Sequence, residues 1–373
     1  MATPPLESSA PVSDREQKIL GIIENTRAKR PRFKAEQVTM AHGAGGKSTQ
    51  TMIEGLFVPA FAGADDAEGL GALADAGTVS VDGTGLAMTT DSFVVKPIRF
   101  PGGSIGELAV NGTANDLAMA GARPLAMTVA LILEEGLRAE ELRAEVEAIA
   151  LAATAAGVEI VSGDTKVVER GWCDSMYITT TGVGVVDARA GLAPANLRPG
   201  DRVLVSGPIG EHGTAIMLAR DEFELDADIE SDTQPVWPAA NALLGAAGDG
   251  LHCMRDATRG GVATVLNELA RASGVAIVAR EGDVPVQPAV TGAAEILGID
   301  PMYVANEGRL VAFVAPEAAD AALAALRDVP GSDGAAEIGE VKTDPPGMVL
   351  VETAFGGKRV MDLLAGDPLP RIC

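Results

Sequence analysis

The stretch Val158-Glu-Ile-Val-Ser-Gly-Asp-Thr-Lys166 gives the clearest indication of the fold. Its first four residues predict a short strand, and a turn rich in glycine and threonine follows, with Asp164 inside it. The residues before this stretch, from Arg138 to Ala156, have the character of a helix that ends at Gly157. A helix that leads directly into a strand is typical of α/β proteins, and we expect that architecture here.

The same alternation of strands and helices extends along the chain in both directions. In the first half we expect strands over Leu86–Thr90 and Ser175–Thr180, and a helix that Ser104 caps and Gly121 ends. The second half repeats the rhythm with further strands and helices, over Arg202–Val205, Gly261–Ala272, Arg309–Val314 and Ala318–Arg327. Two consecutive α/β units are therefore expected.

Turn residues divide the chain into parts. The string Leu197-Arg-Pro-Gly-Asp201 is the best boundary in the middle of the sequence. Proline and glycine become frequent from Thr343 onward, where only the strand Met348–Val351 and a helical turn over Arg359–Leu364 are expected. We expect four parts: a flexible N-terminal extension at 1–37, one α/β domain at 38–190, a second at 191–342, and a C-terminal tail at 343–373.

Length, charge and cysteine content exclude several classes of protein. A chain of 373 residues is long enough for two domains, and its net charge of −23 argues against nucleic-acid binding. No apolar run reaches about 18 residues, so we expect no membrane span. The N-terminus lacks the basic-then-apolar order of a secretory signal. Three widely spaced cysteines without a C-x-x-C pair argue against a disulfide framework or a zinc site and favour the cytoplasm.

A glycine-rich loop, His42-Gly-Ala-Gly-Gly-Lys-Ser48, is the first segment that could bind a ligand. With Ala41 it fits a relaxed P-loop pattern, but the strict pattern requires glycine at that position. The preceding residues, Glu36–Met40, are also too polar for the buried strand that a P-loop follows. We interpret the segment as a flexible loop whose backbone N–H groups and Lys47 bind phosphates, with a plain surface turn as the alternative.

Acidic residues in the first half suggest a metal site. Asp91 follows a predicted strand, Asp116 lies on a predicted helix, and Asp164 ends another predicted strand. Asn111 and Asn115 are four residues apart and share one face of that helix. Each carboxylate alone could be a cap or turn residue, but three of them beside a glycine loop favour a site for Mg²⁺ and a nucleotide.

The second half contributes fewer reactive features. Asp256-Ala-Thr-Arg-Gly-Gly261 opens a predicted helix and could bind an anion at the free N–H groups there, although an ordinary helix entry fits equally well. Glu307 lies in a polar turn, Asn306-Glu-Gly308, where solvation is the usual outcome unless it faces a site. Cys373 is the last residue, so it cannot be a prenylation site, which needs cysteine fourth from the end. A chance terminal cysteine remains the alternative.

Together these strings resemble the superfamily of aminoimidazole-ribonucleotide synthetase and selenophosphate synthetase, and most closely its HypE family. The resemblance runs from about Val38 to the end of the chain. It is carried by the strings Ala41–Lys47, Thr89–Ser92, Asn115–Leu117, Gly163–Lys166, Asp256–Gly261, Asn306–Gly308 and Pro370–Cys373. The terminal Pro-Arg-Ile-Cys is the most specific string, because the sister families lack it.

The resemblance implies a fold and a ligand set. It implies a two-domain α/β subunit, with the N-terminal strands of two copies joined in a barrel-like dimer core. It implies ATP and Mg²⁺, with Asp91, Asp116 and Asp164 as metal ligands. The residues implied in ATP binding are His42, Gly43, Gly45, Gly46, Lys47, Asn111, Asn115, Thr165, Asp256, Thr258, Gly260 and Gly261.

The resemblance also implies an activity. Members of the family dehydrate a carbamoyl group on the terminal cysteine to a thiocyanate, which becomes a cyanide ligand of [NiFe] hydrogenase. This assigns Cys373 as the carrier, with Lys166 and Glu307 credited with proton removal from the nitrogen. The implied partners are a carbamoyltransferase and an iron-bearing maturation scaffold. Two other hypotheses remain: a sister ATP-dependent synthetase or small-molecule kinase, and an acidic scaffold that uses nucleotide only as a switch.

Overall fold

The computed structural model describes residues 32–43, 45–61, 74–220, 227–353, 355–364 and 371–373. Most of the expected N-terminal extension and part of the expected C-terminal tail lie outside these ranges. Among the described residues, no helix is both long and apolar enough to cross a membrane.

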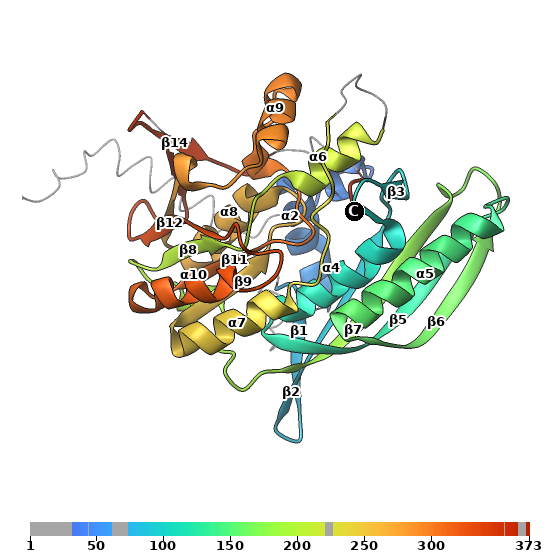
Figure 1. Cartoon of the computed structure of the whole chain (residues 1–373), viewed down its shortest axis with the longest axis horizontal. Coiled ribbons are helices and arrows are strands. Elements are labelled where there is room, and N and C mark those ends of the chain that lie inside the picture. The colour runs from blue at the N-terminus through green and yellow to red at the C-terminus, as the bar shows by residue number, and fades with distance from the viewer. Residues whose placement is uncertain (1–31, 44, 62–73, 221–226, 354, 365–370) are drawn as a thin grey trace, which may run out of the picture.

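The first half is built on a five-stranded sheet in the order β1-β2-β7-β5-β6. Its strands are β1 (Gly77–Val81), β2 (Thr84–Phe93), β5 (Ala122–Glu134), β6 (Glu159–Val168) and β7 (Met176–Val186). The helices α4 (Ile105–Met119) and α5 (Ala139–Ala156) cover one face of this sheet (Figure 1). The core beneath them is apolar, with Ile105 and Leu108 of α4 packed against Met176 and Ile178 of β7.

The second half is built on a seven-stranded sheet in the order β14-β13-β10-β12-β8-β11-β9. Its strands are β8 (Arg202–Val205), β9 (Leu251–Asp256), β10 (Ala276–Arg280), β11 (Leu310–Val314), β12 (Ala336–Lys342), β13 (Val349–Glu352) and β14 (Lys358–Met361). Helix α8 (Gly261–Ser273) packs on one face, and α7 (Trp237–Ala247) and α10 (Ala319–Arg327) pack on the other. Successive side chains of β8 point to opposite faces of the sheet. Val203 and Val205 pack in the core under α8, whereas Leu204 packs in the core under α7 and α10.

The remaining elements are short. They are α2 (Lys47–Met52), α3 (Val58–Phe61), β3 (Arg99–Phe100), β4 (Gly103–Ser104), α6 (Glu211–Leu218) and α9 (Pro288–Leu297), with several single-turn helices between them.

Helices α4 and α5 cover only one of the two faces of the five-stranded sheet (Figure 1). Thr180 of β7 is fully buried and its hydroxyl bonds to the Ala109 carbonyl of α4, so this row of side chains faces the helices. The neighbouring row faces away from α4 and α5, and on that open face apolar side chains are between 39% and 52% exposed, at Val79, Val81, Met88 and Ile132. Exposed apolar surface of this kind marks an interaction site in soluble proteins.

The α/β architecture expected from the sequence is confirmed, and most predicted elements lie within a few residues of their predicted bounds. Two strands extend further than expected. Asp91 and Asp164 were predicted to follow strands, but they lie inside β2 and β6, because the backbone ladders to β7 and β5 continue past them. The predicted helical turn over Arg359–Leu364 was wrong. Its first residues form β14, which pairs with β13 at the edge of the larger sheet.

Candidate active site

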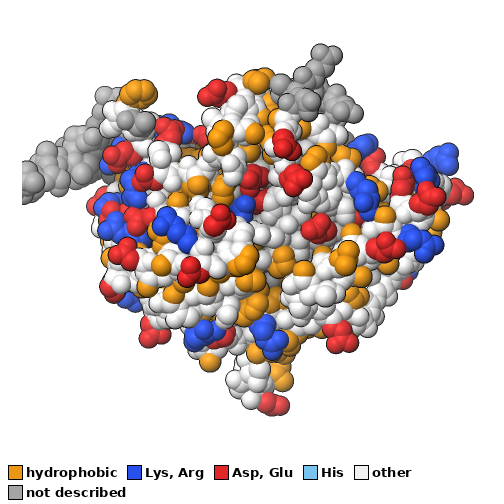
Figure 2. Space-filling model, in the orientation of Figure 1, with side chains coloured by type: hydrophobic (Ala, Val, Ile, Leu, Met, Phe, Trp, Pro, Cys, Tyr) orange, Lys and Arg blue, Asp and Glu red, His pale blue; other side chains and the backbone are white. Residues whose placement is uncertain are grey.

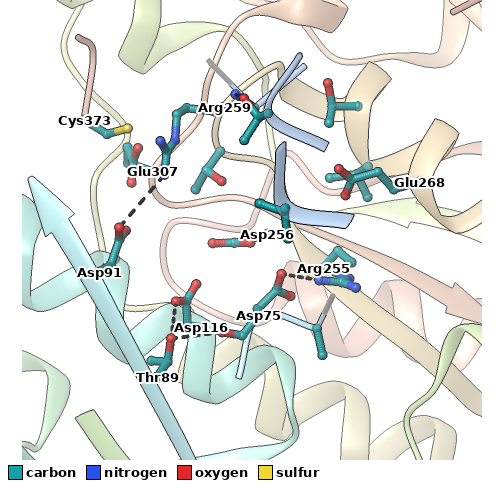
Figure 3. Close-up of a pocket in the computed structure, with 18 of the residues that line it drawn as sticks. Asp75, Thr89, Asp91, Asp116, Arg255, Asp256, Arg259, Glu268, Glu307 and Cys373 are labelled. Atoms are coloured by element: carbon teal, nitrogen blue, oxygen red, sulfur yellow. Dashed lines mark hydrogen bonds and ion pairs between the residues drawn. The ribbon is translucent and has the colours of Figure 1, made fainter. Parts of the chain in front are cut away.

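A pocket of about 450 Å³ opens where the two halves meet. Its lining comes from distant parts of the chain: Gly45 of the glycine loop, Asp91 of β2, Asp116 of α4, Asp256 of β9 and Glu307 of the turn before β11. Figure 3 shows these acidic side chains converging on one space. The volume falls within the range of about 300–1,000 Å³ in which small-molecule sites lie.

Buried carboxyl groups dominate the pocket. Thr89 donates a hydrogen bond of 2.8 Å to Asp116 Oδ2, but burial together with the charges of Asp256, Asp75 and Asp91 holds the pKa of Asp116 well above its usual value. Burial and neighbouring carboxylates also hold the pKa of Asp256 well above its ordinary range. Carboxylates crowded in this way favour binding a cation, which relieves their mutual repulsion.

Hydrogen bonds to its backbone N–H and carbonyl groups hold Glu307 in place. Its N–H donates to Asp232 Oδ1 at 3.0 Å, and its carbonyl accepts from the Asn115 amide at 3.0 Å. The carboxyl group is buried, and its Oε1 atom has no hydrogen-bond partner among the described residues. Burial, followed by the charges of Asp256 and Asp232, raises the pKa of Glu307 well above its usual value. The solvation expected for a turn glutamate is therefore absent, and the group is available to a ligand.

Two arginines supply positive charge. Arg255 forms a buried ion pair with Asp75 at the pocket wall. Arg259 Nη2 lies 3.9 Å from Asp91 Oδ1, and its Nη1 donates to the Gly43 carbonyl at 3.1 Å. Arg259 thus links the glycine loop to the acidic wall.

The C-terminal cysteine is in the pocket. A terminal carboxylate oxygen of Cys373 accepts a hydrogen bond of 3.1 Å from the N–H of Val94, just past the end of β2. The sulfur points inward, toward Glu307 and Arg259 (Figure 3). The other two cysteines, Cys173 and Cys253, are both buried elsewhere.

The glycine loop reaches the pocket only in part. Gly45 lines the cavity, and a Cβ at this position would lie 3.1 Å from Cβ of Arg259. Lys47 is turned to Asp362, with Nζ 2.7 Å from Oδ2, and Gly46 lies under the Leu364 carbonyl. His42 bonds to Thr39 within its own turn and is not part of the pocket wall.

The start of α8 requires glycine. Gly260 and Gly261 have φ values of +76° and +62°, a region that favours glycine. A Cβ on Gly261 would lie 2.6 Å from the carbonyl oxygens of both Met302 and Val304. Thr258, three residues before this helix start, lines the pocket, whereas Gly260 and Gly261 are not among the residues that line it.

The predicted asparagines hold the two halves together. Asn115 donates to the Gln234 and Glu307 carbonyls at 3.0 Å each and accepts from the Val236 N–H at 2.8 Å. Asn111 is buried and donates to Thr233. Neither side chain lines the pocket, so in this structure both connect α4 to the second half.

Asp164 lies on the other face of the sheet from Asp91. Asp91 pairs with Thr180 on the face that α4 covers, whereas Asp164 pairs through Ala130 with the alternate row on the open face. Asp164 is exposed and forms an ion pair with Lys166, whose side chain is also exposed. Thr165, between them, lines no part of the pocket. Within one chain, Asp164 and Lys166 therefore do not join Asp91 and Asp116.

Some pocket residues gave little signal in the sequence. Asp75 stands alone in a stretch without a motif, and Arg255 is the second-last residue of the buried strand β9. Glu268 lies one helical turn after Thr264, on the same face of α8, and that spacing could have indicated it. Burial raises the pKa of Glu268 to about 7 despite the opposing charge of Arg255.

Family comparisons agree with this geometry. Residues 73–186 match the family model of the AIR synthase related protein, N-terminal domain, and residues 198–351 match that of the C-terminal domain. The carbamoyl dehydratase HypE of Rhodobacter capsulatus is 48% identical over 340 residues, which cover 91% of this chain and 98% of that protein.

The chain belongs to the HypE family. Among solved structures, a HypE–HypF complex is similar with a TM-score of 0.79 and 43% identity, covering 84% of this chain and 99% of that one. A HypE maturation protein in complex with ATP matches with a TM-score of 0.75 and 43% identity, over 90% of this chain and all (100%) of that one.

The described residues do not form a complete metal centre on their own. Among them, no group of three or more histidine, cysteine, aspartate or glutamate side chains is placed to hold a metal ion. Oxygen ligands and unpaired acidic charge are nevertheless present in the pocket, and these are what Mg²⁺ with a nucleotide phosphate requires. The space-filling view shows basic side chains dispersed among acidic ones on the visible face, without a continuous basic surface (Figure 2).

Proposed function

We propose that this chain is an ATP-dependent carbamoyl dehydratase that converts an S-carbamoyl group on Cys373 to an S-thiocyanate. The observation that carries the proposal is the position of Cys373, whose thiol shares one pocket with Asp91, Asp116, Asp256 and Glu307. A carrier thiol and a phosphoryl-transfer site are thus within reach of each other. The HypE relatives, named as carbamoyl dehydratases, support the same activity.

The reaction needs ATP because the carbamoyl oxygen is a poor leaving group. Transfer of the γ-phosphoryl group to that oxygen, with loss of one proton from the nitrogen, gives a phosphorylated intermediate and ADP. The C–O bond then breaks, phosphate leaves, and loss of the second nitrogen proton completes the C≡N bond. Phosphoryl transfer of this kind depends mainly on positioning and charge neutralisation.

Glu307 is the proposed proton acceptor on this chain. Its unpartnered Oε1 is buried beside the thiol, and its raised pKa makes its carboxylate a stronger base than an ordinary glutamate. The Asp232 carboxylate fixes the turn from behind. The residue can therefore accept a proton from a nitrogen attached to Cys373 without rearranging its backbone.

Asp91 and Asp116, with phosphate oxygens as further ligands, would hold Mg²⁺, and Asp256 would add negative charge beside them. When bound, Mg²⁺ neutralises phosphate charge during transfer. Thr258 and the N–H groups at the start of α8 would bind phosphate oxygens, and Gly45 and Arg259 would close over them.

The functional unit is proposed to be a homodimer that completes this site. The open face of the five-stranded sheet presents both exposed apolar side chains and the Asp164–Lys166 pair. Packing two such faces together would cover the apolar side chains. It would also bring the edge strand β6 of one protomer toward its partner. There the side chains of Asp164 and Lys166 could serve as metal ligand and second proton acceptor, and the backbone of Thr165 could serve as ATP contact, because the Thr165 side chain belongs to the covered row of Leu131 and Ile178. The expected barrel-like dimer core belongs to this proposal.

The partners follow from the carrier chemistry. A thiocyanate group on a protein must be loaded as a carbamoyl group and later given up. We propose a carbamoyltransferase as the loading partner, supported by the solved complex of a related HypE with HypF. An iron-bearing maturation scaffold is the proposed acceptor of cyanide. None of the three cysteines forms a disulfide, which fits a reducing compartment, and we propose the cytoplasm.

The mass of the C-terminal peptide tests the proposal. After loading by a carbamoyltransferase, addition of Mg²⁺ and ATP should convert the carbamoyl form to one lighter by one water. Cys373→Ala should bind ATP but accept no carbamoyl group, and Glu307→Gln should load but stall before water is lost. Modification of Cys173 or Cys253 instead would overturn the assignment. If deletion of Cys373 left turnover of a free small substrate unchanged, a sister synthetase or kinase would be the correct activity.

A further inference from the structure

The last three residues are bound by a defined set of contacts. The N–H of Val94 donates to a terminal carboxylate oxygen of Cys373, and the N–H of Lys96 donates to the Arg371 carbonyl. The last three residues therefore pair with the segment that follows β2. The Arg371 guanidinium donates to the Val94 carbonyl at 3.2 Å and forms an ion pair with Asp174. The Ile372 side chain is buried in the core of the first half.

The carbonyl of Ile372 points the other way and meets a histidine. Nε2 of His212, the second residue of α6, lies 2.7 Å from this oxygen. His212 is completely buried, and its ring packs edge-on against Phe100 with a centroid separation of 5.6 Å. The imidazole therefore has little freedom to turn.

The hydrogen-bond chain around His212 fixes its tautomer. At one end the Thr233 N–H can only donate, and it lies 3.2 Å from Ser231 Oγ. Ser231 Oγ lies 2.8 Å from His212 Nδ1. At the other end the Ile372 carbonyl can only accept, so Nε2 carries the proton and Nδ1 accepts from the serine hydroxyl. Every donor and acceptor in this buried series of hydrogen bonds then has a partner.

We infer that His212 is a positioning residue for the dehydration step, which holds the Ile372 carbonyl through Nε2–H and thereby seats the Cys373 thiol in the pocket. The inference rests on the proposed function for its catalytic consequence. A carrier thiol must leave the pocket to be loaded and must return to be dehydrated. His212 favours the inserted position because the buried donor loses its partner when Ile372 withdraws.

Two amide substitutions of His212 distinguish the effect of its hydrogen bond from the effect of its packing. In His212→Gln the amide Nε2 stands close to the position of the imidazole Nε2 and can donate to Ile372. In His212→Asn the shorter amide reaches only the Nδ1 position, on the Ser231 side. His252→Asn is the matched control, since His252 is buried and bonded to Asp201 Oδ2 at 2.8 Å, away from the tail.

The alkylation rate of Cys373 measures the tail position without any enzymatic reaction. We expect His212→Asn to increase this rate about two- to tenfold, the population change that one hydrogen bond supports. His212→Gln and His252→Asn should match the unmodified protein. Cys173 and Cys253 are internal references for the fold, because both are buried and burial raises the pKa of the Cys253 thiol to about 12. They should stay unmodified in every variant.

The second readout is dehydration of the preloaded chain in a single turnover with ATP. His212→Asn should slow conversion of the carbamoyl form by a similar factor, His212→Gln should restore it, and the KM for ATP should not change. Equal alkylation rates at Cys373 in His212→Asn and His212→Gln would overturn the inference. If alkylation changes as expected but no chain, including the unmodified one, forms a thiocyanate, the proposed function fails while His212 still positions the tail.

Discussion

Lys47 Nζ lies 2.7 Å from Asp362 Oδ2, which links the glycine-rich loop to the residues directly after β14. The backbone reinforces the link, since the Lys47 N–H donates to the Leu364 carbonyl at 3.3 Å. Arg271 of α8 also binds Asp362, through Nη2 at 2.8 Å. The cation expected to bind phosphate thus has a carboxylate partner within its own chain.

This pairing predicts competition between Asp362 and ATP for Lys47. Asp362→Asn should lower the KM for ATP by up to about fivefold, because an exposed ion pair contributes only about 0.2–1 kcal/mol. Lys47→Met should raise the KM. Steady-state phosphate release against ATP concentration measures both, with Glu352→Gln, at the exposed pair with Lys358, as the control. A KM that rises in Asp362→Asn would show that the pair supports ATP binding instead.

Asp116 should be essential for catalysis and dispensable for folding. Burial and three neighbouring carboxylates raise its pKa, so the neutral amide of Asp116→Asn resembles the form that the ligand-free protein prefers. We expect the Tm of the ligand-free variant to stay equal or rise. ATP hydrolysis should fall about 100-fold or more, as when a charge-stabilising group is removed from an active site. Calorimetry and phosphate release on one preparation check both, and wild-type turnover with a normal Tm would remove Asp116 from the metal site.

Much of this arrangement could be predicted from local sequence, because glycine-rich turns and helix starts carry local signals. Asp256 and Thr258 precede the start of α8 at Gly261, and both line the pocket. The position of Lys166 could not be predicted in this way. The string around it says nothing about which face of a sheet it occupies, and that depends on the register of β6 against β5.

Residues that meet only through tertiary packing were also out of reach. Asp75 and Arg255 are 180 positions apart and pair only when the two halves close. The short apolar pattern that starts at Arg359 fits the period of a helix or of a strand, and its pairing with β13 decides for a strand.

Glu268 predicts a pH dependence of stability. Its folded pKa is about 7, above its ordinary value of 4.5, so the folded state binds a proton that the unfolded state has lost. The resulting stabilisation is complete below pH 4.5 and is lost as the pH rises through 7. In the ligand-free protein, Glu268→Gln should therefore flatten the fall of Tm in this window, whereas the exposed Glu295→Gln should leave it unchanged. Identical slopes for Glu268→Gln and the unmodified protein would refute the assignment.

Mixed dimers test whether Asp164 completes the site of a neighbouring protomer. Asp91 and Asp164 lie on opposite faces of one sheet, so a site that needs both must draw them from two chains. Asp91→Asn and Asp164→Asn homodimers should then both be inactive in ATP hydrolysis. Co-expression with two different affinity tags yields the mixed dimer, in which one site carries both substitutions and the other carries neither. The purified mixed dimer should recover about half of the unmodified activity, as expected for a two-fold interface with one intact site.

Co-expression of Asp91→Asn with Asp116→Asn is the control. Both residues belong to one pocket, so each site of that mixed dimer lacks one of them and no recovery follows. If the Asp91→Asn and Asp164→Asn pair also recovers nothing, although mixed dimers form, both carboxylates act within one chain and the proposed sharing is wrong.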